Sequence, residues 1–202
     1  LAPTVGLQTT NNLTIGSYGT TTLDADTNTT VLGVVGDLYI GPVGTLLADA
    51  TADVTINGSY DNDGVFTANG GQVNMRGNGS HTIAAGASDF ANLTLDGTGT
   101  FRFVEDATTT EDFIIEVLAG VSMSTTSSTT LAVGGDFRND TDGLDTDWTG
   151  STLYLYSGGA YTVGQSDEND TYNIVESAND TQPRFWNSTF TSVVTATGSS
   201  LY

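Results

Sequence analysis

A degenerate repeat of about 80 residues constrains this chain more than any other feature. Residues 54–62 (VTINGSYDN) align with residues 131–139 (LAVGGDFRN) at an offset of 77. Residues 12–15 (NLTI) align with residues 92–95 (NLTL) at an offset of 80. A pattern that returns with drifting sequence but steady phase is typical of repeat architectures. We therefore predict one continuous repeat domain over residues 1–202, with copy one at about 12–91, copy two at about 92–172 and a partial copy three at about 173–202.

Within each copy, short bursts of alternating apolar residues are typical of β-strands. The bursts are three to six residues long, as at 13–15 (LTI) and 153–156 (LYLY), and Gly, Asn or Asp separates them. Only 110–118 (TEDFIIEVL) has helix-like spacing, but its counterpart one copy earlier, 36–40 (GDLYI), is strand-like. We therefore predict a strand there and an all-β fold.

Two all-β architectures fit this repeat. In a β-solenoid (β-helix), coils of about 20–25 residues stack at about 4.8 Å, the spacing between neighbouring strands. In tandem β-sandwich domains, each copy would close its own core. Asn-Gly turns at 57–58 and 78–79 suit the corners of a solenoid, whereas Trp148 and Trp186 do not occupy equivalent positions as a repeated sandwich core would require. The sequence favours the β-solenoid, with tandem β-sandwiches as the alternative.

The third copy stops in the middle of the pattern at Tyr202. An incomplete repeat leaves unpaired strand edges, and such edges are templates for pairing with another chain. We expect either copies of this chain that stack end to end, or the continuation of a longer chain. Both outcomes predict an extended structure.

The balance of charge excludes whole classes of partner. Asp and Glu number 24 against four Arg and no Lys, which gives a formal net charge of −20. Binding to nucleic acid needs Lys and Arg to displace counterions from phosphates, so we expect no nucleic-acid partner. Cysteine is absent, which removes disulfides and thiolate metal sites. No apolar run reaches the roughly 18 residues of a membrane-spanning helix, so we expect no membrane span. We also expect no required cofactor.

The densest carboxylate cluster is the candidate for a metal site. Alternating carboxylates around a Gly turn can present several oxygens to one hard cation such as Ca²⁺. The cluster lacks the bidentate Glu of an EF-hand loop, and a solvated turn is the other interpretation. The candidate Ca²⁺ ligands are Asp140, Asp142, Asp145 and Asp147.

Asn-x-Ser/Thr triplets are enriched in this chain. Nine of the fourteen asparagines begin such a triplet without Pro in the middle. By chance, the Ser and Thr content of the chain would produce roughly four such triplets. Used sites would coat the protein with glycans and place it outside a cell or on its surface; the other interpretation is turn chemistry alone. The nine residues are Asn12, Asn28, Asn57, Asn78, Asn92, Asn139, Asn169, Asn179 and Asn187.

No residue is predicted to be catalytic. His81 is the only histidine, and its counterpart one copy later is Tyr161, so we expect a packed planar ring rather than a member of a catalytic triad. Arg102 and Arg184 are also equivalent to each other, which favours structural pairing or stacking.

A recurring motif carries a resemblance to known proteins. Gly-Asp-Leu/Phe occurs at 36–38 and at 135–137, the second followed by Asn139, with Gly-Gly at 70–71 and Asn-Leu-Thr-Leu at 92–95. This pattern resembles the β-strand repeats of large secreted surface proteins of bacteria and archaea. The resemblance implies a right-handed β-helix-like fold and roles in adhesion, sheaths or extracellular fibres, and it implies no catalytic residue.

The expected function is therefore that of a non-enzymatic structural protein of the cell surface or extracellular space. It would be a filament, sheath or surface-layer subunit carrying N-linked glycans. One alternative is an adhesin or carbohydrate-binding β-solenoid, in which Tyr154 and Tyr156 would stack on sugars. A second alternative is a polysaccharide-degrading β-helix enzyme, which needs two carboxylates about 5–10 Å apart in a groove.

Overall fold

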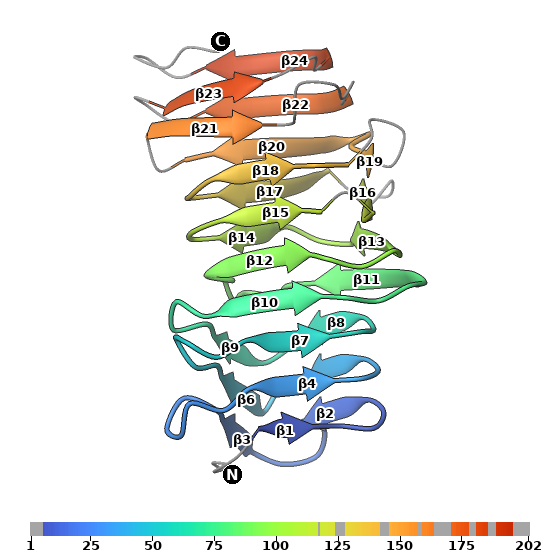
Figure 1. The fold of residues 1–202 in the computed structure, drawn as a ribbon, viewed down its shortest axis with the longest axis vertical. Helices are drawn as coiled ribbons and strands as arrows, with labels where there is room; N and C mark the ends of the chain where they lie inside the picture. The colour runs from blue at the N-terminus through green and yellow to red at the C-terminus, as the bar shows by residue number, and fades with distance from the viewer. Residues whose placement is uncertain are drawn as a thin grey trace.

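In the computed structural model, the chain winds as a rising coil of parallel β-strands (Figure 1). The structure describes residues 6–116, 118–123, 128–141, 146–156, 159–163, 171–177, 181–185 and 189–195, with the backbone alone beyond residue 156. Within these ranges every strand pairing is parallel and no residue is helical. The predicted all-β solenoid is confirmed, and the segment of helix-like spacing contains a strand, Phe113–Ile115.

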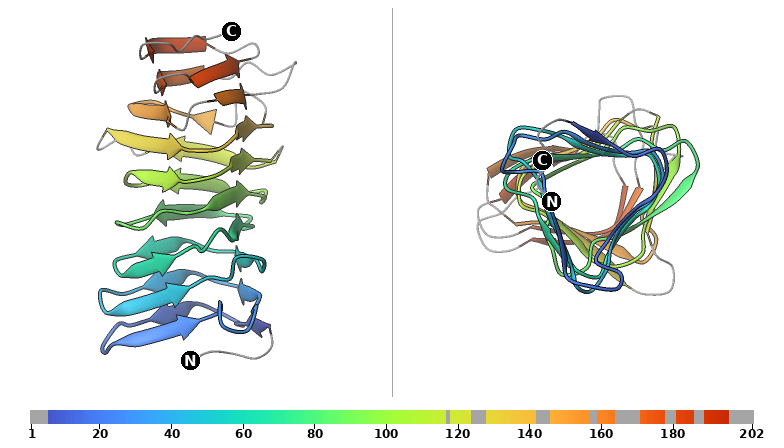
Figure 2. Two further views of the ribbon diagram at one scale, coloured as in Figure 1. Left: turned by 90° about the vertical axis from the view of Figure 1, so that its left-hand side faces the viewer. Right: turned by 90° about the horizontal axis from the view of Figure 1, so that it is seen from below.

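The coil has three faces, which together give a roughly triangular outline when seen from below (Figure 2). Sheet A contains β1 (Leu7–Gln8), β4 (Leu32–Val34), β7 (Val54–Ile56), β10 (Gln72–Met75), β12 (Asn92–Leu95), β15 (Phe113–Ile115) and β18 (Phe137–Asn139). Sheet B contains β2 (Leu13–Ile15), β5 (Leu38–Ile40), β8 (Tyr60–Asn62), β11 (Ser80–Ala84), β13 (Thr100–Phe103), β16 (Gly120–Met123) and β19 (Thr146–Asp147).

The third face is divided into two sheets. Sheet C contains β3 (Thr21–Asp24), β6 (Gly44–Leu47) and β9 (Val65–Thr67). Sheet D contains β14 (Ala107–Thr109), β17 (Thr129–Val133), β20 (Ser151–Leu155), β22 (Thr171–Ser177) and β24 (Thr189–Thr195). A further pair, β21 (Gly159–Val163) and β23 (Thr181–Phe185), lies above β18 on the side of sheet A (Figure 1).

On sheet A, one turn of the coil takes 19 to 25 residues. Paired residues on sheet A show this directly, because each lies on the next: Leu7, Leu32, Val54, Val73, Leu93, Phe113 and Phe137. In Figure 1 the chain runs to the right along sheet A and returns behind it while rising from the N-terminus, so the coil is right-handed. A right-handed path is the usual one between parallel strands of a sheet.

The 80-residue sequence repeat relates strands on different faces. Val54 lies in sheet A and stacks on Val73, whereas its sequence counterpart Leu131 lies in sheet D. Leu13 lies in sheet B, and its counterpart Leu93 lies in sheet A. The sequence similarity therefore marks a strand with its preceding turn, and the unit that stacks is the single coil.

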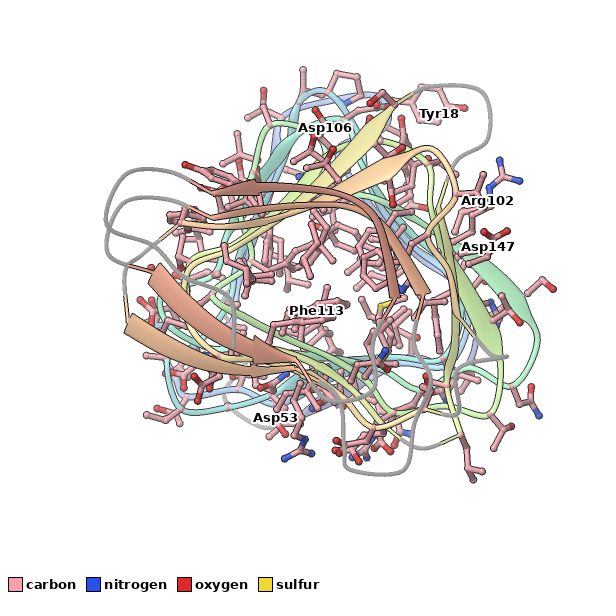
Figure 3. The ribbon with its side chains drawn as sticks, turned by 90° about the horizontal axis from the view of Figure 1, so that it is seen from above. Tyr18, Asp53, Arg102, Asp106, Phe113 and Asp147 are labelled. Carbon is pink, nitrogen blue, oxygen red and sulfur yellow. The ribbon has the colours of Figure 1, made fainter. Side chains whose placement is uncertain are left out.

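The core runs along the axis of the coil. Strands such as β4, β5 and β7 alternate between buried and half-buried residues, because successive side chains of a strand point to opposite faces. Aromatic rings extend this core upward, with Phe113 stacked on Phe137 at 5.6 Å between ring centroids. Figure 3 shows Phe113 inside the coil, while Tyr18, Arg102 and Asp147 lie outside it. The buried apolar residues form one cluster that spans the coils, so each coil is stabilised by its neighbours.

Candidate functional site

A ladder of polar residues runs along sheet B, immediately before β2, β5 and β8 and within β11. The Asn12 Oδ1 atom accepts the backbone N–H of Asp37 at 3.0 Å, and Asp37 Oδ1 accepts that of Ser59 at 2.8 Å. The Ser59 hydroxyl oxygen accepts the N–H of Thr82 at 3.1 Å. We call these four residues the B ladder. Each acceptor satisfies the backbone N–H at the same position one coil further on, where a corner would otherwise leave it without a partner.

A second ladder stands at the start of the sheet A strands. Asn92 Oδ1 accepts the N–H of Asp112 at 3.2 Å, and Asp112 Oδ1 accepts that of Asp136 at 2.8 Å. We call these three residues the A ladder. Asn92 also donates to the Glu111 carboxylate at 2.8 Å, which ties the side chain further to the next coil.

The ladders explain the Gly-Asp-Leu/Phe motif. A Cβ on Gly36 would lie 2.0 Å from Asn12 Oδ1, and one on Gly135 would lie 2.3 Å from Asp112 Oδ1. Real Cβ contacts do not come this close, so only glycine leaves room for the side chain of the coil below. In this motif the glycine makes room for the acceptor side chain of the coil below, and the Asp that follows supplies the acceptor for the coil above.

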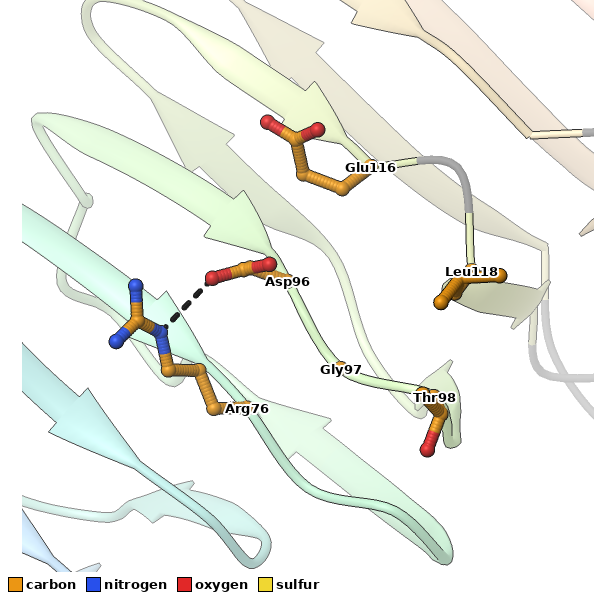
Figure 4. A pocket seen from close by; sticks show the side chains of 6 residues that line it. All are labelled: Arg76, Asp96, Gly97, Thr98, Glu116 and Leu118. Carbon is orange, nitrogen blue, oxygen red and sulfur yellow. Dashed lines mark ion pairs between the residues drawn. The ribbon is translucent and has the colours of Figure 1, made fainter.

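A groove with a volume of about 360 Å³ lies at the corner between sheets A and B. Arg76 and Asp96 form an ion pair across it at 2.9 Å, with each side chain about half exposed (Figure 4). We call it the A–B groove, lined by Arg76, Asp96, Gly97, Thr98, Glu116 and Leu118. This groove was not predicted from the sequence, although Arg76, Asp96 and Glu116 recur every 20 residues, which is the length of the coils at this height.

Charge pairing continues above the groove. Arg138, on β18, donates to Glu116 at 3.0 Å and to Asp140 at 2.8 Å. The two carboxylates that line the groove are therefore each paired with an arginine. In a chain with four arginines and a net charge of −20, this corner is where two of them collect.

The outer surface of sheet B is acidic. The Tyr39 hydroxyl donates to Asp63 at 2.8 Å, and this hydrogen bond raises the pKa of Tyr39. Partial burial, followed by the negative charges of Asp63 and Glu105, raises the pKa of Asp61. Because these carboxylates repel one another, they disfavour any anionic ligand on this face.

The predicted Ca²⁺ cluster is described only in part. Asp140 is buried at 5% exposure and pairs with Arg138, whereas Asp147 is exposed on β19 and accepts the N–H of Thr149 at 3.0 Å. Asp142 and Asp145 lie outside the described residues. Among the side chains that the structure describes, no three His, Cys, Asp or Glu residues stand close enough to hold a metal ion. The Ca²⁺ site stays a prediction.

The described sequons fall into three environments. Asn28, Asn57 and Asn78 are exposed in turns or corners. Asn12 and Asn92 belong to the ladders, where their side-chain amides are hydrogen-bonded to the next coil. Asn169, Asn179 and Asn187 lie outside the described residues.

Asn139 differs from the other described sequon asparagines because it is buried. Its side chain is fully buried, and its Oδ1 atom accepts both the N–H and the hydroxyl of Thr141 at 3.3 and 2.9 Å. A glycan on this residue would have to enter the core, so the folded chain offers no access to it. The sequon pattern could not show this because it does not say on which side of a strand the asparagine points.

The singled-out rings and arginines have ordinary surroundings. His81 packs beside Phe101 with 5.7 Å between ring centroids, as expected for a packed planar ring. Arg102 is exposed on sheet B without an ion pair to any described residue, and the side chain of Arg184 lies outside the described set. Tyr154 and Tyr156 are half-buried on sheet D with their rings 5.9 Å apart.

No protein-family model, curated protein or solved structure matches this chain. Among the described residues, no helix has the length and hydropathy to cross a membrane.

Proposed function

We propose that this chain is a structural, non-enzymatic subunit of an extracellular filament, sheath or surface layer. The observation that carries the proposal is the continuity of the coil: one apolar core and two side-chain ladders link each turn to the next. In such a stack each coil contacts only its neighbours, so the molecule lengthens without changing its cross-section. A rod of this kind is suited to bearing load or spanning distance.

The surface supports an external location for this rod. Many described Thr and Ser residues, such as Thr14, Ser17 and Thr51, are exposed, and the net charge of −20 keeps the surface hydrated and soluble. Asn57 and Asn78 are exposed at the same corner of successive coils, between sheets A and B. Glycans on these two asparagines would project from one edge of the rod and leave the faces uncovered.

Assembly would extend the coil in its own register. On β2 the N–H of Leu13 donates to Asp37 at 2.8 Å, and the Ile15 carbonyl accepts from Gly41 at 2.8 Å. Backbone groups alternate in direction along a strand, so the N–H of Thr14 points away from β5. A second copy, or further coils of a longer chain, would pair with such groups.

Electron microscopy of the native material, with intact mass on the same sample, tests this proposal. We expect fibres with a 4.8 Å axial repeat and a mass above that of the bare chain. Thr14→Pro, which removes the outward N–H, should abolish fibres, while Thr14→Ser should keep them. Compact monomers of unmodified mass at every concentration and salt would refute the proposal.

A second candidate function is carbohydrate binding by the tyrosine pair. The rings of Tyr154 and Tyr156 are tilted by only 32°, and the Tyr156 hydroxyl donates to the Thr109 carbonyl oxygen at 3.1 Å, which holds that ring down on the sheet. Near-parallel aromatic faces suit stacking on sugar rings. A glycan panel would test this: Tyr154→Ala should abolish binding, and a panel without hits would exclude the candidate.

A further inference from the structure

Asn-Gly pairs are places where a chain can modify itself. Glycine has no side chain to keep its backbone nitrogen away from the side-chain carbonyl carbon of the preceding asparagine. This sequence has three such pairs, Asn57-Gly58, Asn69-Gly70 and Asn78-Gly79. We propose that Asn78-Gly79 is a self-modification site at which His81 acts as general base and Asn78 is converted to aspartate or isoaspartate. This inference is independent of the proposed structural role, and it concerns chains in which Asn78 carries no glycan.

The other two Asn-Gly pairs differ from this one because contacts with neighbouring coils hold them in place. A Cβ on Gly58 would lie 2.5 and 2.6 Å from the carbonyl carbon and oxygen of Gly36, so the coil below holds that turn in place. The Asn69 side-chain amide donates to the carbonyl oxygen of Ala48 at 2.8 Å, which ties it to the neighbouring coil.

The Asn78 side chain, by contrast, is not held by such contacts with the described residues. It is exposed in the turn between β10 and β11, and its side chain makes no hydrogen bond to any residue that the structure describes. The side-chain carbonyl carbon can therefore rotate toward the backbone nitrogen of Gly79.

The only imidazole of the chain lies over this turn. His81 Nε2 accepts the backbone N–H of Gly79 at 3.2 Å, so Nε2 is the unprotonated nitrogen. A Cβ on Gly77 would lie 2.1 Å from Nε2, so a glycine there leaves room for the ring, and Phe101 supports the ring from the next coil. A base placed on the proton of the attacking group is the arrangement that activates a weak nucleophile.

The reaction needs only water. As the Gly79 nitrogen forms a bond to the Asn78 side-chain carbonyl carbon, His81 takes the proton from that nitrogen. The bond from this carbon to Nδ2 then breaks, the imidazolium returns the proton, and ammonia leaves. Water opens the resulting cyclic imide at either carbonyl, giving aspartate or isoaspartate with one added negative charge. A glycan on Nδ2 of Asn78, in the sequon Asn78-Gly79-Ser80, would block the first step.

Peptide mapping of the folded full-length chain, aged in neutral buffer, tests the proposal. The readout is the mass gain of one unit at each asparagine, with isoaspartate confirmed by its shifted chromatographic retention. We expect Asn78 to convert ahead of Asn57 and Asn69. Equal rates at the three asparagines would overturn the proposal.

Two variants isolate the base. His81→Phe keeps a ring beside Phe101 but has no basic nitrogen, and His81→Gln offers a hydrogen-bond acceptor without being a base. Both should slow conversion of Asn78 at least fivefold, a smaller effect than the 10²–10⁴ contributed by general bases in enzymes. The rate at Asn57 should not change, which controls for altered stability. An unchanged rate at Asn78 in either variant would overturn the role of His81 as base.

Discussion

Gly58→Ala should destabilise the coil strongly, because the backbone of the coil below occupies the space of the new methyl group. The added Cβ would lie 2.4 Å from Asp37 Oδ1 and 2.5 and 2.6 Å from the carbonyl carbon and oxygen of Gly36. Ordinary contacts begin near 3.4 Å, so the two coils must separate locally by roughly 1 Å. That movement stretches the 2.8 Å hydrogen bond from Ser59 to Asp37.

The expected magnitude combines two effects. Overpacking of a close-packed site costs about 1–3 kcal/mol, and weakening a hydrogen bond to a charged acceptor adds about 1.5–3 kcal/mol. We therefore expect Gly58→Ala to lower the free energy of unfolding by about 2.5–6 kcal/mol. Gly19→Ala is the matched control, because no atom lies within 4 Å of its Cβ position and its φ is not positive. The control should be neutral or stabilising by up to about 1 kcal/mol, since alanine restricts the unfolded chain.

Urea denaturation followed by circular dichroism measures this difference. Since a solenoid can unfold in segments, exchange of the Ser59 amide hydrogen should be followed in parallel and should accelerate in Gly58→Ala. If the two alanine variants unfold at the same urea concentration, the steric account of the B ladder is wrong.

Three further predictions follow from buried or ladder residues. Tyr60→Phe should stabilise the protein by about 1 kcal/mol, because the Tyr60 hydroxyl is buried without a hydrogen-bond partner among the described residues; a lower urea midpoint would contradict this. Asp112→Ala should cost about 1.5–3 kcal/mol by removing the acceptor of the Asp136 N–H, whereas Asp112→Asn keeps an acceptor and should cost less than half as much; equal losses would argue against the A ladder. Hydrogen bonds from the Thr51 hydroxyl and N–H lower the pKa of Asp49, so its stabilisation is present above the unfolded pKa of about 3.9 and is lost as the pH falls through the lower folded value. The difference in urea midpoint between wild type and Asp49→Asn should therefore shrink as the pH drops below about 4, and a constant difference would refute the assignment.

Much of the candidate site was accessible from local patterns. The Gly-Asp-Leu/Phe motif could be recognised in the sequence, and Gly36 and Asp37 stand directly before β5, where Asp37 belongs to the B ladder. The A–B groove was not accessible in this way. Its ion pair joins Arg76 to Asp96 across one coil, and a comparison at the 80-residue offset could not bring those two residues together.

The sequence by itself determined where strands and corners lie, because alternation, glycine and Asx residues act over a few neighbouring positions. Only the tertiary structure decided which strands stack. A strand with its preceding turn is built in the same way on different faces, as Asp37 on sheet B and Asp112 on sheet A show. The local pattern therefore does not indicate on which face a strand lies. The number of residues in each coil decides the face, and insertions of a few residues at corners change that number. The burial of Asn139 in the core and the support of the His81 ring by Phe101 of the next coil depend on stacking.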